Sequence, residues 1–149
     1  KSINININFI EAYNNKGNIL LKLNRFEEAV KSFDYVIEKL PRYCPVYFNK
    51  GNALIALDRL DEAVEVFNNS LNINPEYSEA YLGKGLILLK KKKYNEAIFE
   101  FNASIEKKSN NSDAYINRAH ALYQLNEYES SLENFDEAIK LNPKKSYII

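Results

Sequence analysis

One stretch of the sequence, residues 45–75, contains the whole of a pattern that fills the chain. It reads PVYFNKGNALIALDRLDEAVEVFNNSLNINP. On each side of Asp58-Arg59, apolar and small residues recur at steps of three and four, which is the spacing of an amphipathic helix. Pro75 ends the second segment because proline cannot continue a helix. The stretch therefore predicts two helices joined by a short polar turn.

The same pattern returns every 34 residues. The columns in register are Gly17, Gly51 and Gly85 with Ala119 fourth; Ala29, Ala63 and Ala97 with Ser131 fourth; Tyr13, Tyr47, Tyr81 and Tyr115; Phe33, Phe67, Phe101 and Phe135; and Pro41, Pro75 and Pro143, with Ser109 in the third repeat. A fixed period of this size indicates stacked copies of one small supersecondary unit. Glycine inside a helix costs ~1 kcal/mol relative to alanine, so the glycine column predicts a close helix crossing that offsets this cost.

The turns between the paired helices are also periodic. They are Asn24-Arg25, Asp58-Arg59, Lys92-Lys93 and Asn126-Glu127. Asn and Asp tolerate the left-handed backbone conformation that ends a helix, and an acidic residue suits the start of the next one. We therefore expect each turn to close its first helix in this way.

These residues resemble the tetratricopeptide repeat, whose pattern is an aromatic residue, Leu-Gly, a large residue, Ala-x-x-x-Phe and a terminal proline. The first repeat reads Tyr13-x-x-Lys16-Gly17-x-x-Leu20, then Ala29-x-x-x-Phe33 and Pro41. The chain departs from this pattern at several positions. Tyr replaces Trp, the third repeat lacks its Pro, and the fourth has Ala119 and Ser131 in place of Gly and Ala. The Leu position holds a cation whose stem we expect to pack between helices (Lys16, Lys50, Lys84 and Arg118). The resemblance implies an all-α fold, a right-handed superhelical solenoid of four helix-turn-helix repeats.

The repeats are expected at residues 10–43, 44–77, 78–111 and 112–143. Residues 1–9, where Ile and Asn alternate, are expected to form an N-terminal tail, and residues 144–149 the truncated start of a further repeat or capping helix. Without a capping helix, the outer face of the predicted Tyr128–Leu141 helix should stay partly apolar, which is a liability in a solenoid. Because the sequence contains no Met, we expect a fragment or a processed chain.

The composition and net charge argue against several classes of function. The chain is 46% hydrophobic and its formal net charge is zero, which argues against a generic nucleic-acid or anionic-membrane binder. The single Cys44 rules out an internal disulfide and is compatible with a reducing compartment, so we expect a cytoplasmic location. One histidine, His120, and one cysteine make neither a metal site nor a nucleophile–base pair. We therefore expect no catalytic residue, no metal and no cofactor.

The first helix of each repeat lines a concave groove in this family, and one arc of each predicted first helix carries the candidate peptide-binding residues. They are Asn15, Asn18, Phe48, Asn49, Asn52, Leu82, Leu86, Ile116, Asn117 and His120. An asparagine amide offers a donor and an acceptor, so a row of amides can pair with an extended peptide backbone. Some family members bind peptides through such an asparagine ladder, and Asn15, Asn49 and Asn117 look similar. The alternative is that asparagine at these columns is family consensus without use.

Chaperone-binding members instead use a carboxylate clamp, a set of Lys, Asn, Asn, Lys and Arg that grips a C-terminal carboxylate. Asn18 and Asn49 match two clamp positions, but the three cation positions hold Asn14, Glu79 and Gly83. Without the cations there is no charge-assisted grip, so we reject the clamp.

The sequence therefore predicts a non-catalytic module that binds a protein or an extended peptide, with neither nucleic acid nor membrane as partner. Two alternatives stay open. One is self-association into a homo-oligomer through the uncapped C-terminal repeat. The other is a scaffold fragment of a larger enzyme.

Overall fold

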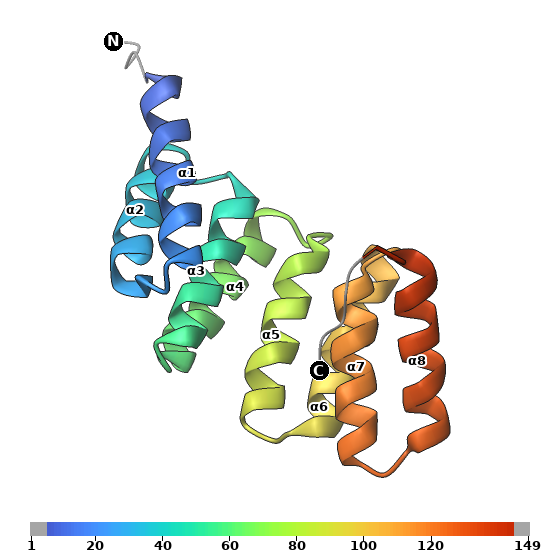
Figure 1. Cartoon of the computed structure of the whole chain (residues 1–149). Coiled ribbons are helices and arrows are strands. Elements are labelled where there is room, and N and C mark those ends of the chain that lie inside the picture. The colour runs from blue at the N-terminus through green and yellow to red at the C-terminus, as the bar shows by residue number, and fades with distance from the viewer. Residues whose placement is uncertain (1–5, 145–149) are drawn as a thin grey trace. The chain divides into compact units, whose positions relative to one another are not determined.

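The computed structural model describes residues 6–144, and the regular secondary structure in that range is entirely helical (Figure 1). The eight helices are α1 (Ile7–Lys22), α2 (Phe26–Lys39), α3 (Cys44–Ala56), α4 (Leu60–Ile73), α5 (Ser78–Lys90), α6 (Tyr94–Lys107), α7 (Ser112–Gln124) and α8 (Tyr128–Leu141). They form two compact units: unit 1 holds α1 to α4, up to residue 75, and unit 2 holds α5 to α8, from residue 76. Each unit holds two helix pairs, so the predicted all-α repeat fold is confirmed.

Helix α1 begins earlier than the sequence predicted. Ile7, Asn8 and Phe9 form its first turn, so the prediction of a tail through residue 9 is wrong for these three residues. The turn closes because the N–H groups of Phe9 and Ile10 both donate to the Asn6 carbonyl oxygen, at 3.0 and 3.4 Å. Residues 1–5 of the predicted tail, and residues 145–149 of the predicted truncated repeat, lie outside the described residues.

The two helices of a repeat cross where a glycine faces a phenylalanine. Phe33, Phe67 and Phe101 are fully buried. A Cβ atom added to Gly17, Gly51 or Gly85 would overlap the phenylalanine ring of the same repeat. The glycine column therefore exists because the ring occupies the space that a side chain would need.

The helix crossing of the last repeat differs in the residues that meet there and in how deeply they are buried. Ala119 takes the glycine position and is fully buried, whereas Phe135 is only half-buried. The Phe135 ring lies edge-on to the His120 imidazole, with 5.2 Å between the ring centroids. The Ser131 hydroxyl donates to the Ala119 carbonyl oxygen at 2.8 Å, which ties α8 to α7 at this point.

The turns adopt the conformation that the sequence predicted. Asn24, Asp58, Lys92 and Asn126 have φ values of 57°, 59°, 59° and 63°. The N–H of the next residue then donates to a carbonyl oxygen five residues back, as Arg59 does to Leu54 at 2.9 Å. Lys92 differs from the other three residues, because lysine lacks the short polar side chain that lowers the energetic cost of positive φ for Asn and Asp.

We predict that Lys92→Gly stabilises the protein by about 0.5–1 kcal/mol, because glycine adopts positive φ without the strain that lysine carries there. The matched control is Lys91→Gly, where φ is −76° and glycine only adds conformational entropy to the unfolded chain. Urea denaturation followed by circular dichroism measures both variants. A loss of stability for Lys92→Gly equal to that for Lys91→Gly would contradict the argument.

Candidate functional site

The first helices of unit 1 bring amide side chains together. Asn18 lies on α1 and Asn49 on α3, and the Asn49 Nδ2 donates a hydrogen bond to the Asn18 Oδ1 at 3.0 Å. Asn15 is exposed, whereas Asn18, Asn49 and Asn52 are half-buried. The two asparagine rows predicted from the sequence therefore meet where repeats 1 and 2 adjoin.

The hydrogen bond between Asn18 and Asn49 engages only some of the donors and acceptors of the two side-chain amides. Each amide has two N–H donors and a carbonyl oxygen with two acceptor sites. One donor of Asn49 and one acceptor site of Asn18 are engaged with each other, and the other donors and acceptor sites of the two amides take no part in this bond. The mutual bond also holds both side chains in one orientation, which lowers the entropy that a ligand must remove when it binds.

Phe48 adds an apolar component to the same helix face. Its ring centroid lies 6.2 Å from that of Phe67, with the planes tilted by 47°. Phe67 is fully buried and Phe48 half-buried, so one side of Phe48 is anchored in the core and the rest reaches the surface. We call the set Asn15, Asn18, Phe48, Asn49 and Asn52 the amide surface.

The candidate peptide-binding residues of unit 2 are less available for contact with a ligand than those of the amide surface. The Asn117 Nδ2 donates to the Asp113 carbonyl oxygen of its own helix at 2.8 Å, so part of this amide is engaged with the backbone. Leu82 is 4% exposed and belongs to the core, so we remove it from the candidate surface. Leu86 and Ile116 are half-buried, and His120 is exposed with its ring against Phe135.

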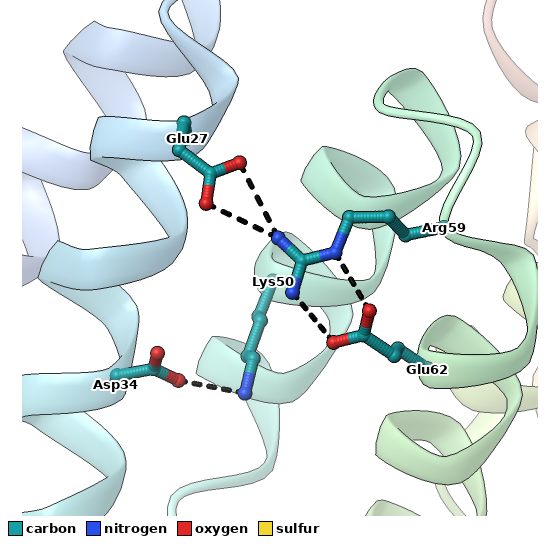
Figure 2. Close-up of polar contacts among 5 residues, drawn as sticks. All are labelled: Glu27, Asp34, Lys50, Arg59 and Glu62. Atoms are coloured by element: carbon teal, nitrogen blue, oxygen red, sulfur yellow. Dashed lines mark hydrogen bonds and ion pairs between the residues drawn. The ribbon is translucent and has the colours of Figure 1, made fainter.

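Lys50, Lys84 and Arg118, which stand at the leucine position of the repeat pattern, have polar partners on second helices. Lys50 Nζ lies 2.6 Å from Asp34 Oδ1 on α2 (Figure 2), and Lys84 Nζ lies 3.2 Å from Glu100 Oε1 on α6. Arg118 donates to the side-chain oxygens of Asn102 and Asn134, both at 2.7 Å. In each case the partner is 16 residues away along the chain, a spacing that the sequence analysis did not use. Burial lowers the pKa of the Arg118 guanidinium, but arginine stays charged in proteins.

A second polar cluster joins repeats 1 and 2 at the turn before α4. Arg59 binds Glu62 at 2.6 and 2.7 Å and also reaches Glu27 on α2 at 3.2 and 3.3 Å (Figure 2). The hydrogen bond from Arg59 lowers the pKa of the Glu62 carboxyl. Exposed pairs of this kind contribute little stability.

Unit 1 also contains a shallow cavity that the sequence analysis did not predict. Its volume is about 260 Å³, and it is lined by Tyr13, Lys16, Glu28, Lys31 and Ser32. The lining residues come from α1 and α2, and Tyr13 and Lys16 occupy the helix arc opposite the amide surface. The cavity is therefore separate from the amide surface.

The single cysteine and the single histidine lie on different helices, α3 and α7. Cys44 is half-buried in α3, with its Sγ 4.0 Å from the Ser70 carbonyl oxygen, and His120 belongs to unit 2. Within residues 6–144, no group of three or more His, Cys, Asp or Glu side chains is placed to hold a metal ion. Over the same range, no helix combines the length and the apolar character that crossing a membrane requires.

Comparison with family models gives matches along most of the chain. One model described as a tetratricopeptide repeat matches residues 10–43 and 112–145, and a second with that description matches residues 78–111. A third, described as a TPR repeat, matches residues 51–92. Among curated proteins, no sequence match was found.

Several solved structures share this fold. TTC0263, a thermophilic TPR protein of Thermus thermophilus, superposes with a TM-score of 0.83 at 19% identity, covering 94% of this chain and 77% of that one. The first TPR of Spaghetti (RPAP3), bound to the HSP90 peptide SRMEEVD, gives 0.71 at 21% identity over 84% and 99%. MamA from Desulfovibrio magneticus RS-1, from residue 41 to its end, gives 0.69 at 25% identity over 91% and 77%.

Proposed function

This chain belongs to the tetratricopeptide repeat family, and from that premise we propose that it is a non-catalytic module that binds an extended peptide on the amide surface. The family and the fold support a protein-interaction module. The observation that carries the more specific proposal is the 3.0 Å hydrogen bond between Asn49 and Asn18, which puts amides from two consecutive repeats on one face.

The chemistry of the amide surface favours an extended backbone as ligand. A peptide unit presents one N–H donor and one carbonyl acceptor, and an asparagine amide complements both. Each such hydrogen bond contributes only about 1 kcal/mol net, so amides alone give weak binding. Phe48, half-buried beside them, supports the choice of a peptide with an apolar side chain in register with the amides.

The neighbour bound to the HSP90 peptide SRMEEVD supports the choice of a peptide as the ligand class. For our chain we propose an internal peptide segment instead of a free C-terminal carboxylate. The clamp's cation positions hold Asn14, Glu79 and Gly83. Glu79 is acidic and is paired with Lys108, whose Nζ lies 3.0 Å from its carboxylate, so it offers nothing to an anionic terminus.

The remaining predicted residues extend this proposal to unit 2, where Leu86, Ile116, Asn117 and His120 stay candidates for peptide contact. Self-association and a scaffold role in a larger enzyme stay as alternatives to it. The cytoplasmic location expected from the sequence also stays a prediction.

We predict that the double variant Asn49→Ala, Asn52→Ala weakens peptide binding by about ten- to thirtyfold, since two amide hydrogen bonds of about 1 kcal/mol are lost. Melting should change little, because the one hydrogen bond lost within the protein, from Asn49 to Asn18, contributes only about 1 kcal/mol. The probe is a peptide selected against the parent chain from a displayed library of random 12-mers. Its Kd is measured by calorimetry and the melting by circular dichroism.

The matched control is Asn68→Ala, Asn69→Ala on α4, where both side chains are exposed and outside the amide surface. This variant should keep the parent Kd. If Asn49→Ala, Asn52→Ala leaves the Kd unchanged and lowers the melting temperature, the two asparagines are scaffold residues and the proposal fails.

A further inference from the structure

Arg118 on α7 occupies a repeat position at which two other repeats place a cation beside a carboxylate. In repeat 2, Lys50 pairs with Asp34, which lies 16 residues before it. In repeat 3, Lys84 pairs with Glu100, which lies 16 residues after it. Arg118 has no acidic partner among residues 6–144. No carboxylate of the described chain therefore balances the charge of the cation in repeat 4.

Two asparagines stand where a carboxylate partner of Arg118 is expected. Asn102 on α6 lies 16 residues before Arg118, and Asn134 on α8 lies 16 residues after it. The side-chain oxygens of both asparagines accept hydrogen bonds from Arg118, each at 2.7 Å. An amide oxygen accepts a hydrogen bond as a carboxylate oxygen does, but it carries no negative charge. The two asparagines therefore position the guanidinium without neutralising it.

The Arg118 guanidinium is held in one orientation while some of its donors stay unused. Its Cζ lies 5.2 Å from the centroid of the Tyr115 ring, and Nε and Nη1 donate to the two amide oxygens. Within residues 6–144, Nη2 makes no hydrogen bond. The side chain is half-buried, and a partly desolvated charge interacts with an anion more strongly than an exposed charge does. Arg118 thus combines a fixed geometry, unused donors and an unbalanced charge.

We propose that Arg118, held between Asn102 and Asn134, binds a single carboxylate group of a partner protein. The chain itself indicates this chemistry, because the cation at the same position of repeats 2 and 3 is paired with a carboxylate. The planar guanidinium also matches a carboxylate through two parallel hydrogen bonds. No residue of this site belongs to the amide surface, so the proposal does not rest on the peptide-binding function proposed above.

An exposed phenylalanine beside Asn102 indicates what else the partner contacts. Phe99 is 73% exposed and precedes Asn102 by three residues on α6, so the two side chains are neighbours on one face of the helix. The equivalent residues of the other three repeats are all charged (Lys31, Glu65 and Glu133). Covering the Phe99 ring removes apolar surface from water, which a free carboxylate ion cannot do. We therefore expect the partner to place an apolar side chain on Phe99 and a carboxylate on Arg118.

The acidic residues of α8 limit the charge that the site accepts. This helix carries four acidic residues and one basic residue (Glu129, Glu133, Asp136, Glu137 and Lys140). Glu133 directly precedes Asn134, and Glu137 follows it by three residues. Like charges oppose a ligand that brings more negative charge than Arg118 balances, and a phosphate group carries about two negative charges at neutral pH. These residues therefore favour a single carboxylate over a phosphate group or a run of acidic residues.

The test begins with peptides that depend on Arg118. The probe is selected from a displayed library of random 12-mers by keeping peptides that bind the parent chain and discarding those that bind Arg118→Gln. The selected peptides should contain Asp or Glu together with an apolar residue. Calorimetry should give a Kd about ten- to hundredfold higher for Arg118→Gln, as expected when a charge-assisted hydrogen bond is lost.

Asn134→Asp separates a binding role of Arg118 from a structural one. It introduces a carboxylate at the position that Glu100 occupies in repeat 3, so Arg118 gains an internal partner and keeps its place between α6 and α8. The peptide should then bind about tenfold more weakly or worse, while circular dichroism shows the parent helicity. The matched control is Asn110→Asp, which adds the same charge at an exposed position before α7 and should keep the parent Kd.

A further variant distinguishes this site from the amide surface. Asn49→Ala, Asn52→Ala should bind the selected peptides with the parent Kd, because these residues lie in unit 1 and outside the proposed site. Phe99→Ser should weaken the same peptides by about threefold or more, since the apolar contact is lost. An unchanged Kd for Phe99→Ser would remove Phe99 from the site.

Three results overturn the proposal. The first is a selection that gives no peptide able to distinguish the parent from Arg118→Gln. The second is an Asn134→Asp variant that keeps its helicity and binds the peptide as the parent does, because the role of Arg118 is then to join α6 and α8. The third is displacement of the peptide by inorganic phosphate at a lower concentration than by acetate, which would make a phosphate group the ligand.

Discussion

Gly51→Leu should lower the free energy of unfolding by about 1–3 kcal/mol, as overpacking of a filled core does. The reason lies in the crossing of α3 and α4, where a Cβ atom on residue 51 would overlap the Phe67 ring. Phe67 is fully buried, so its ring can move only by displacing other core side chains. Urea denaturation followed by circular dichroism measures the loss.

The control for this variant is Ala56→Leu, which adds the same kind of side chain to the same helix at an exposed position. It should change stability by no more than about 0.5 kcal/mol. A Gly51→Leu protein that unfolds at or above the parent's urea midpoint would show that the crossing is not closely packed there.

Phe67→Ala should cost more, about 3–5 kcal/mol, because it removes a fully buried ring and leaves a cavity where the helices of repeat 2 cross. A second phenylalanine of the same chain serves as the comparison for this substitution. Phe135 occupies the same repeat position but is half-buried, so Phe135→Ala loses less buried surface and should cost about 1–2 kcal/mol.

Urea denaturation of the two phenylalanine variants gives the comparison directly. Equal losses would mean that Phe135 supports its repeat as strongly as Phe67 does. That result would contradict the view that Ala119 changed the packing of the last repeat.

The fold was predictable because its determinants are local and repeated. Helix periodicity, the polar turn and the glycine column all lie within one 34-residue unit, and the structure confirms the crossing at Gly51 and the left-handed turn at Asp58. In a solenoid each repeat contacts only its neighbours, so four copies of a weak local signal reinforce one prediction. The first turn of α1 was missed because alternating Ile and Asn gave no helical spacing to detect.

The candidate site was only partly predictable. A helical wheel placed Asn18 and Asn49 on related arcs of their helices, but their hydrogen bond depends on where two separate helices lie. The wheel also placed Leu82 on a surface arc, whereas the structure buries it. The angular position of a side chain fixes its direction, while its exposure depends on what packs in front of it.

The repeat, its helices, its turns and the close crossing at its glycine column follow from the order of residues within one unit, so the amino-acid sequence alone predicts them. The pairing of Lys50 with Asp34, the hydrogen bond from Asn49 to Asn18 and the burial of Leu82 are known only from the packed helices. Hydrogen bonds and ion pairs form over about 2.6–3.2 Å, and burial requires a neighbour in contact. Such distances are set only when helices from different repeats are packed together.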